Sequence, residues 1–276
     1  MMEPVSASQI GVAMAASLVL WWFSTGAILW LVRRPRAAAG WTLGLSSLVA
    51  VIALIGLAVV ARDQSVFGAY WAFGFALTVW GWHELGFLMG KITGPRRTPC
   101  PPTASGWMRF RVSAETVIHH EIALVATAIV IAALAWGQPN QTGTLTFALL
   151  LAMRLSTKLN IFLGVRNPPI TFLPSGLTYL QTYFRRARFN ALFPLSLALS
   201  VIAAILLGHA ATDAATSPGM AIGACLMMAL ALLGLLEHAF LMMPSPDRTL
   251  WGWALGDDDK QSRADIILAA AGERDR

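Results

Sequence analysis

The sequence has 276 residues, of which 57% are hydrophobic and 12% are charged, whereas soluble domains carry about 25% charged residues. A water-soluble globule of this composition would lack the polar surface needed to cover its core. The formal net charge of +6 does not indicate nucleic-acid binding, because the basic residues fall between apolar runs and form no separate soluble domain. The composition therefore predicts an all-α, polytopic membrane helix bundle in contact with the lipid bilayer.

The N-terminal part of the chain contains two apolar runs, at about residues 10–32 and 41–61. Each is close to the roughly 20 residues that an α-helix needs to cross the hydrocarbon core. The segment before the first run carries the acidic Glu3 and lacks the basic start of a signal peptide. We therefore expect a retained transmembrane helix there.

The middle of the chain contains three further apolar runs, at about residues 67–90, 113–136 and 144–163. The run at residues 67–90 is apolar and aromatic except for His83 and Glu84 near its end. A polar segment with four prolines, residues 91–111, follows it. Such a composition predicts an irregular connection.

The C-terminal part of the chain contains two more runs, at about residues 189–208 and 220–243. A second long connection precedes them, and its basic, aromatic end at residues 183–188 is a candidate for a short amphipathic helix on the membrane surface. Three consecutive aspartates follow at residues 257–259. The sequence thus predicts a transmembrane bundle over residues 1–244 and a soluble, partly disordered cytoplasmic tail over residues 245–276.

The distribution of basic residues predicts the orientation. If the connections after the first, third, fifth and seventh runs face the cytoplasm, that side receives nineteen of the twenty Lys and Arg residues and only Arg62 lies outside. Six or eight spans would remove this asymmetry. We therefore expect about seven transmembrane helices, with the N-terminus outside and the C-terminus in the cytoplasm.

Ionisable residues within the predicted spans are the most informative local feature, because a charged side chain at the bilayer centre costs about 2.5–3.5 kcal/mol on insertion scales. Four of the five histidines occur in three short clusters with carboxylates. In a seven-span topology all three clusters lie at similar depth in the cytoplasmic half, which predicts that three helices build one site. The candidate metal ligands are His83, Glu84, Glu115, His119, His120, Glu121, Glu237 and His238.

These clusters are open to three interpretations. Imidazole and carboxylate ligands in a helix bundle suit iron or another transition metal, although the Glu-x-x-His spacing of di-iron bundles is absent. The same groups can instead form a buried hydrogen-bonded network that fixes helix packing. In the third interpretation, one histidine is an axial ligand to the magnesium of a bacteriochlorophyll-type tetrapyrrole.

A second set of polar residues, Arg154, Lys158 and Asn160, lies near the inner end of the run at residues 144–163. Arg154 and Lys158 are four residues apart and therefore share a helix face. They are candidates for pairing with the carboxylates or for binding an anionic substituent of a cofactor, such as a propionate. The alternative is that their long side chains extend to the membrane surface.

Three stretches of the sequence carry a resemblance to a known family. They are Gly-Trp-His-Glu-Leu-Gly-Phe at residues 81–87, Ser-Ala-Glu-Thr-Val-Ile-His-His-Glu at residues 113–121, and Arg-Leu-Ser-Thr-Lys-Leu-Asn at residues 154–160, which continues to Gly-Val-Arg-Asn-Pro at residues 164–168. Together they resemble the PuhE-type family of photosynthetic complex assembly proteins from phototrophic bacteria. The resemblance assigns no catalytic residue.

The resemblance implies a multi-pass protein of the bacterial inner, photosynthetic membrane. Such a protein would support bacteriochlorophyll supply or the assembly of photosynthetic complexes. The implied partners are reaction-centre or light-harvesting subunits, or enzymes of pigment synthesis.

Two further function classes stay open. One is a metal-dependent, di-iron-like membrane oxidoreductase that acts on a tetrapyrrole or another lipid-soluble substrate. The other is a transporter, which ranks last because the sequence shows no internal repeat of the kind that many transporters have.

Overall fold

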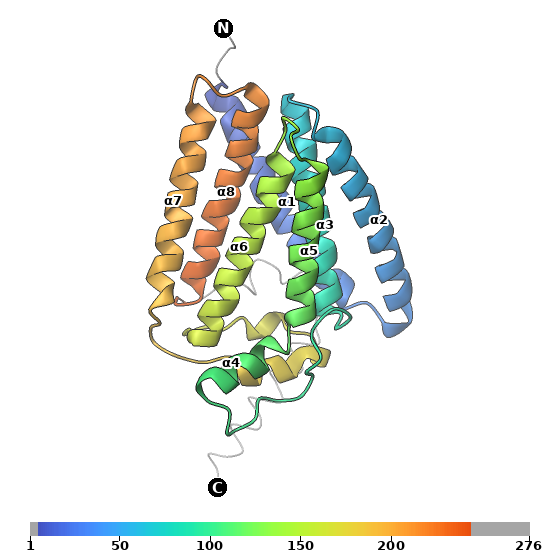
Figure 1. The fold of residues 1–276 in the computed structure, drawn as a ribbon, viewed down its shortest axis with the longest axis vertical. Helices are drawn as coiled ribbons and strands as arrows, with labels where there is room; N and C mark the ends of the chain where they lie inside the picture. Colours follow the sequence, from blue (N-terminus) through green and yellow to red (C-terminus); the bar gives the residue numbers. More distant parts are fainter. Residues whose placement is uncertain (1–4, 244–276) are drawn as a thin grey trace, which may run out of the picture.

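The computed structural model describes residues 5–243, and within this range the regular elements are all helical. The predicted tail at residues 245–276 lies outside the described residues. Seven of the described helices have 17 to 26 residues and run alternately up and down in one bundle (Figure 1). They are α1 (Ala7–Val32), α2 (Ala39–Val60), α3 (Val66–Leu88), α5 (Ile118–Leu134), α6 (Thr142–Leu163), α7 (Leu192–Thr212) and α8 (Pro218–Phe240).

Several helices are long and apolar enough to cross a membrane. Five of the described helices meet this criterion by themselves, namely α1, α2, α6, α7 and α8, and α4 (Gly106–Ala114) with α5 forms a bent pair that is a sixth candidate. The prediction of a multi-pass helical membrane protein is therefore confirmed. The helix α3 has 23 residues but is not among the candidates, since Gly, Trp, Tyr, His and Glu replace many aliphatic residues in it.

Three helices begin at serine caps on the end of the bundle where α7 joins α8 (Figure 1). Ser6 forms a capping box with Gln9 at the start of α1, and the Ser65 hydroxyl accepts a hydrogen bond from the Gly68 N–H at the start of α3. Ser217 caps α8, which then has a proline as its first residue. These N-capping serines define where the three helices begin.

The core of the bundle is built around α8 and α3, whereas α7 and α2 lie at its edges. Small residues allow α8 to approach its neighbours closely. A methyl group at Gly219 would collide with the backbone carbonyl of Gln64, and one at Gly223 would collide with the Thr142 side chain. Close packing of this kind stabilises helix contacts in a membrane, where the hydrophobic effect gives no preference between lipid and protein.

The other end of the bundle is covered by irregular segments and short helices. The helix α4 lies there at 64° to α5, beside the 3₁₀ helices η2 (Ile170–Phe172) and η3 (Ser175–Tyr183). The single helix predicted from about residue 113 is therefore broken at residues 115–117. We call this covering of α4, η2, η3 and their connections the cap.

The expected amphipathic helix at residues 183–188 is not present, because the backbone is tied to the end of α6 instead. The Val165 N–H donates to the Arg185 carbonyl at 3.0 Å, and the Ala187 N–H donates to the Val165 carbonyl at 3.2 Å. These bonds hold residues 184–187 in a non-helical conformation. The helical segment of this connection is η3, which lies earlier in the chain.

Candidate functional site

Six of the predicted site residues gather where α3, α5 and α6 meet near the cap. They come in pairs from the three helices, and we call them the ionic layer: His83 and Glu84, His120 and Glu121, and Arg154 and Lys158. The two cations lie one turn apart on the same face of α6. The prediction placed one site on the clusters of α3, α5 and α8, whereas the structure brings those of α3 and α5 together with Arg154 and Lys158 of α6.

Each carboxylate in the ionic layer has a basic partner from α6. The Arg154 Nη2 lies 2.9 Å from Glu84 Oε2, and the Lys158 ammonium donates to Glu121 Oε1. The Glu84 side chain is only 13% exposed, so its charge requires a partner of this kind. Of the three possibilities for Arg154 and Lys158, the structure shows pairing with the carboxylates.

The two histidines of the ionic layer have different environments. His83 Nε2 lies 2.9 Å from the Thr127 hydroxyl, and its ring packs edge-on against Trp82. His120 is fully buried beside the Phe87 ring, and neither of its ring nitrogens has a hydrogen-bond partner among residues 5–243. Its Nε2 lies 3.9 Å from Glu84 Oε1, which is too long for a hydrogen bond.

The broken helix places His120 at this position. Loop residues 93–96 fill the break between α4 and α5, where the Thr93 carbonyl accepts from the His120 N–H at 3.0 Å and the Arg96 N–H donates to the Glu115 carbonyl at 3.1 Å. Backbone groups freed by a break in a membrane helix need such partners. Only a glycine fits at residue 94, because a methyl group there would collide with the Glu115 carbonyl.

The ionic layer does not have the geometry of a metal centre. No group of three or more His, Cys, Asp or Glu side chains in the described part of the chain is placed to hold a metal ion. The physical reason is that Arg154 and Lys158 already balance both carboxylates, and Thr127 engages His83. The eight predicted metal ligands therefore do not come together as one metal site in the described part of the chain.

Two hollows within residues 5–243 lie away from the ionic layer. One lies between α2 and α5 and the other lies around Leu57 and Asn140, and neither is lined by a residue of the ionic layer.

Three of the predicted ligands lie elsewhere. Glu115 pairs with Arg96 at 3.6 Å and with Arg111 at 3.2 Å in the cap. His119 is exposed on α5, and Glu237 is exposed on α8. Adjacent residues on a helix point about 100° apart, so His119 and Glu237 cannot share the direction of their buried neighbours.

A fourth predicted ligand outside the ionic layer is His238. It belongs to a second buried network, which we call the serine–histidine network. His238 Nε2 lies 2.9 Å from Ser156 Oγ on α6, and Ser156 Oγ lies 2.9 Å from Ser196 Oγ on α7. Asn160, predicted to bind a cofactor, donates from Nδ2 to Ser196 Oγ at 2.8 Å. The predicted single pocket is thus replaced by two networks on nearly opposite faces of α6, since residues two apart differ by about 200°.

The proton positions in the serine–histidine network follow from its acceptors. The Gly234 carbonyl lies 2.8 Å from His238 Nδ1 and can only accept, so Nδ1 carries a proton. The Ser156 hydroxyl donates to Ser196 Oγ at 2.9 Å, and His238 Nε2 lies 2.9 Å from the same Ser156 oxygen. The Ser196 hydroxyl donates to the Leu192 carbonyl at 3.1 Å. These bonds join α6, α7 and α8 in one network.

Sequence reasoning missed Ser156, Ser196 and Thr127. The four-residue spacing of Ser156 and Asn160 on α6 was the one available signal, because it places two polar side chains on one face of an apolar span. Thr127 and Ser196 are single hydroxyl residues within apolar runs. Such residues usually bond to their own helix backbone, and nothing in the sequence distinguished these two.

Comparisons with known proteins cover most of the chain. A family model described as a protein of unknown function, DUF3623, matches residues 7–262. The chain is also 44% identical over 244 residues to the "uncharacterized 30.4 kDa protein in puhA 5′ region" of Rhodobacter capsulatus, and the match covers 87% of this chain and 88% of that protein. No solved structure matches the chain. Because the family model spans nearly the whole membrane bundle, this protein belongs to the DUF3623 family.

Proposed function

We propose that this protein is an inner-membrane factor that supports photosynthetic complex assembly or bacteriochlorophyll supply, and that its ionic layer acts as a lock between helices. The similar Rhodobacter capsulatus protein is described by its position in the puhA 5′ region, which is a photosynthesis gene region. The resemblance of residues 81–87, 113–121 and 154–168 to PuhE-type assembly proteins supports the same proposal. Its partners would be reaction-centre or light-harvesting subunits, or enzymes of pigment synthesis.

The observation that carries the proposal is the pairing of both carboxylates, which are 13% and 19% exposed, with side-chain cations. Glu84 and Glu121 would be metal ligands in a redox centre, but here they bind Arg154 and Lys158. Removing one partner of a buried pair typically costs about 3–5 kcal/mol, so such pairs specify which helix faces meet. This arrangement favours a protein that holds and presents a defined surface over one with a reaction of its own.

The proposal includes seven spans, with the N-terminus outside and the C-terminus in the cytoplasm. The long helices alternate in direction, and α3 passes through the middle of the bundle between α2 and α8 (Figure 1). Within residues 5–243, the connections at the cap end contain the basic residues of the loops, whereas those at the opposite end contain Arg62 alone. Alkaline phosphatase fusions at residues 64 and 138 should be active, and fusions at residues 35 and 100 should be inactive.

Two measurements together test the assembly function. In a phototrophic host, deletion of the gene should lower the absorbance of the assembled reaction-centre and light-harvesting complexes, and a plasmid copy should restore it. The protein purified in mild detergent should carry complex subunits, pigment-synthesis enzymes or bacteriochlorophyll. Normal complexes in the deletion strain, together with a colourless and partnerless protein, would contradict the proposal.

A metal-dependent oxidoreductase is the second candidate, and one observation favours it. His120 is fully buried with both ring nitrogens unpartnered by protein groups, and its Nε2 lies 3.9 Å from Glu84 Oε1. Unsatisfied buried groups in a native structure require an explanation, and a ligand is one. The test is the metal content of the purified protein. One equivalent or more of iron or another transition metal would support this candidate over the first, if His120→Ala loses the metal and His119→Ala keeps it.

A further inference from the structure

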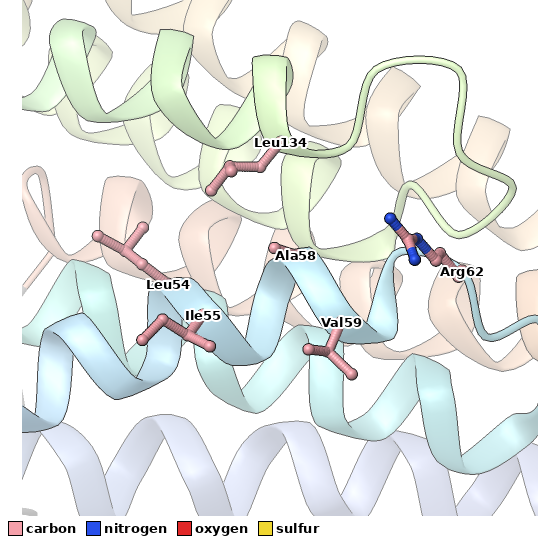
Figure 2. Close-up of a pocket in the computed structure, with 6 residues that line it drawn as sticks. All are labelled: Leu54, Ile55, Ala58, Val59, Arg62 and Leu134. Carbon is pink, nitrogen blue, oxygen red and sulfur yellow. The ribbon is translucent and has the colours of Figure 1, made fainter.

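A hydrophobic groove runs between α2 and α5, far from the ionic layer and close to the end of the bundle opposite the cap. Its volume is about 400 Å³, which is within the range of small-molecule sites. Figure 2 shows the residues that line it: Leu54, Ile55, Ala58, Val59 and Arg62 from α2 and the turn after it, and Leu134 from α5.

The groove is lined along its length by aliphatic side chains that face outward. Ile55 is 61% exposed and Val59 is 66% exposed, so these walls meet the bilayer and not the protein core. From Leu54 to Arg62 the groove follows α2 over eight residues, or about 12 Å at 1.5 Å per residue. A hydrocarbon chain is the natural occupant of such a surface.

Arg62 gives the groove one polar end. It follows directly after the end of α2, at the level where a span reaches the lipid headgroups, and its side chain is exposed. In the part of the chain that the structure describes, no carboxylate lies within ion-pair distance of it. The neighbouring Asp63 is engaged differently, because its Oδ1 accepts from the Ser65 N–H at 2.8 Å.

The polar end of the groove is fixed in place. Asn140, in the turn between α5 and α6, donates from its backbone N–H to the Ala61 carbonyl at 2.9 Å and from Nδ2 to the Val60 carbonyl at 3.0 Å. These bonds tie the end of α2 to that turn. The position of Arg62 relative to the aliphatic walls is therefore set by the protein before anything binds.

We propose that this groove binds one anionic phospholipid, with an acyl chain between α2 and α5 and the phosphate on the Arg62 guanidinium. The planar guanidinium matches phosphate geometry and remains charged at all relevant pH values. Arg62 is the one Lys or Arg in the connections at this end of residues 5–243, so its guanidinium is the cation there that can pair with an anionic lipid headgroup. The bound chain would also support α2, which lies at the edge of the bundle (Figure 1).

Native mass spectrometry of the full-length protein tests the site. The protein is exchanged into nanodiscs of phosphatidylglycerol and phosphatidylcholine in equal amounts, then released and scored for retained lipid. The wild type should retain one phosphatidylglycerol. Arg62→Gln should lower the preference for phosphatidylglycerol about tenfold, and Arg62→Lys should keep part of it, because Lys carries the charge without the planar fork.

Two alanine substitutions provide a matched test of the apolar walls. Ala58→Phe should fill the groove and abolish retention of the lipid, whereas Ala198→Phe, on the exposed face of α7, should leave it unchanged. If Ala58→Phe does not fold, Ala58→Val and the surface variant Arg62→Gln replace it.

Three results would overturn the proposal. They are equal retention of both lipids by the wild type, retention of phosphatidylglycerol in Ala58→Phe, and recovery of a neutral isoprenoid lipid in place of the phospholipid. None of these measurements depends on photosynthetic complexes. The lipid site and the assembly function can therefore fail independently.

Discussion

The two buried networks on α6 make an instructive comparison. Both join three helices, yet the ionic layer pairs carboxylates with Arg and Lys, whereas the serine–histidine network is built from hydroxyl, amide and imidazole groups. The ionic layer lies against the break between α4 and α5 and against loop residues 93–96. Its Arg154 side chain is 32% exposed. In the other network His238 and Ser196 are buried. Because Ser156 lies between Arg154 and Lys158 on α6, both networks are at the same level of the bundle, and the difference lies in the neighbours of each face: α3, α5 and loop residues 93–96 on one side, α7 and α8 on the other.

The largest predicted effect comes from leaving a charge of the ionic layer unpaired. Arg154→Leu removes the partner of Glu84 and should lower the free energy of unfolding in detergent by about 3 kcal/mol, at the low end of the range for buried pairs because Arg154 is partly exposed. Glu84→Gln with Arg154→Leu should recover most of this loss, since no unpaired charge remains. A double variant as unstable as the single one would show that the pair is not the source of the stability.

The next effect concerns the contact between the cap loop and the broken helix. Gly94→Ala introduces a methyl group that collides with the Glu115 carbonyl, so the loop must shift and the bond from the His120 N–H to Thr93 must weaken. We expect a loss of about 1–3 kcal/mol in the free energy of unfolding. Gly176→Ala is the control, because no atom lies near its added methyl group. Equal stability of the two variants in denaturant titrations would contradict the role of the loop.

A comparable but smaller effect is expected in the serine–histidine network. Ser156→Ala removes the hydroxyl that bonds His238 and should cost about 1–2 kcal/mol, because it leaves a buried ring nitrogen unsatisfied. Ser200→Ala is the matched control, since the Ser200 hydroxyl donates to the Ser196 carbonyl on its own helix. Thermal unfolding should separate the two variants, and identical melting temperatures would argue against a network that joins helices.

Much of the bundle could be predicted because its helices follow from long apolar runs. The run expected at about residues 67–90 is α3 at Val66–Leu88, and that expected at about residues 144–163 is α6 at Thr142–Leu163. The break between α4 and α5 could not be predicted, because it depends on loop residues 93–96, which lie about 20 residues earlier in the chain and make its hydrogen bonds.

The sequence could predict how deep the site residues lie along each helix, but not which neighbouring helix each side chain faces. Spacing along each helix placed His83, His120 and His238 at a similar level of the membrane. Which face of a span meets which neighbour depends on packing, and an apolar span offers no polar side to decide it. Spacing on α6 did place Arg154 and Lys158 on one face, and that face is the one that meets the carboxylates.

The two buried histidines, His120 and His238, provide the most direct test of the difference between the ionic layer and the serine–histidine network. The smallest change in stability is expected at His120. His120→Phe replaces a ring without hydrogen-bond partners in residues 5–243 by another aromatic ring beside Phe87, so the free energy of unfolding should change by less than about 1 kcal/mol. His238→Phe should cost more than this, because the Ser156 hydroxyl and the Gly234 carbonyl both lose their contact with the imidazole ring. If His120→Phe is instead the more damaging of the two, His120 binds a group that the protein itself does not supply, and the metal-dependent candidate gains over the helix lock.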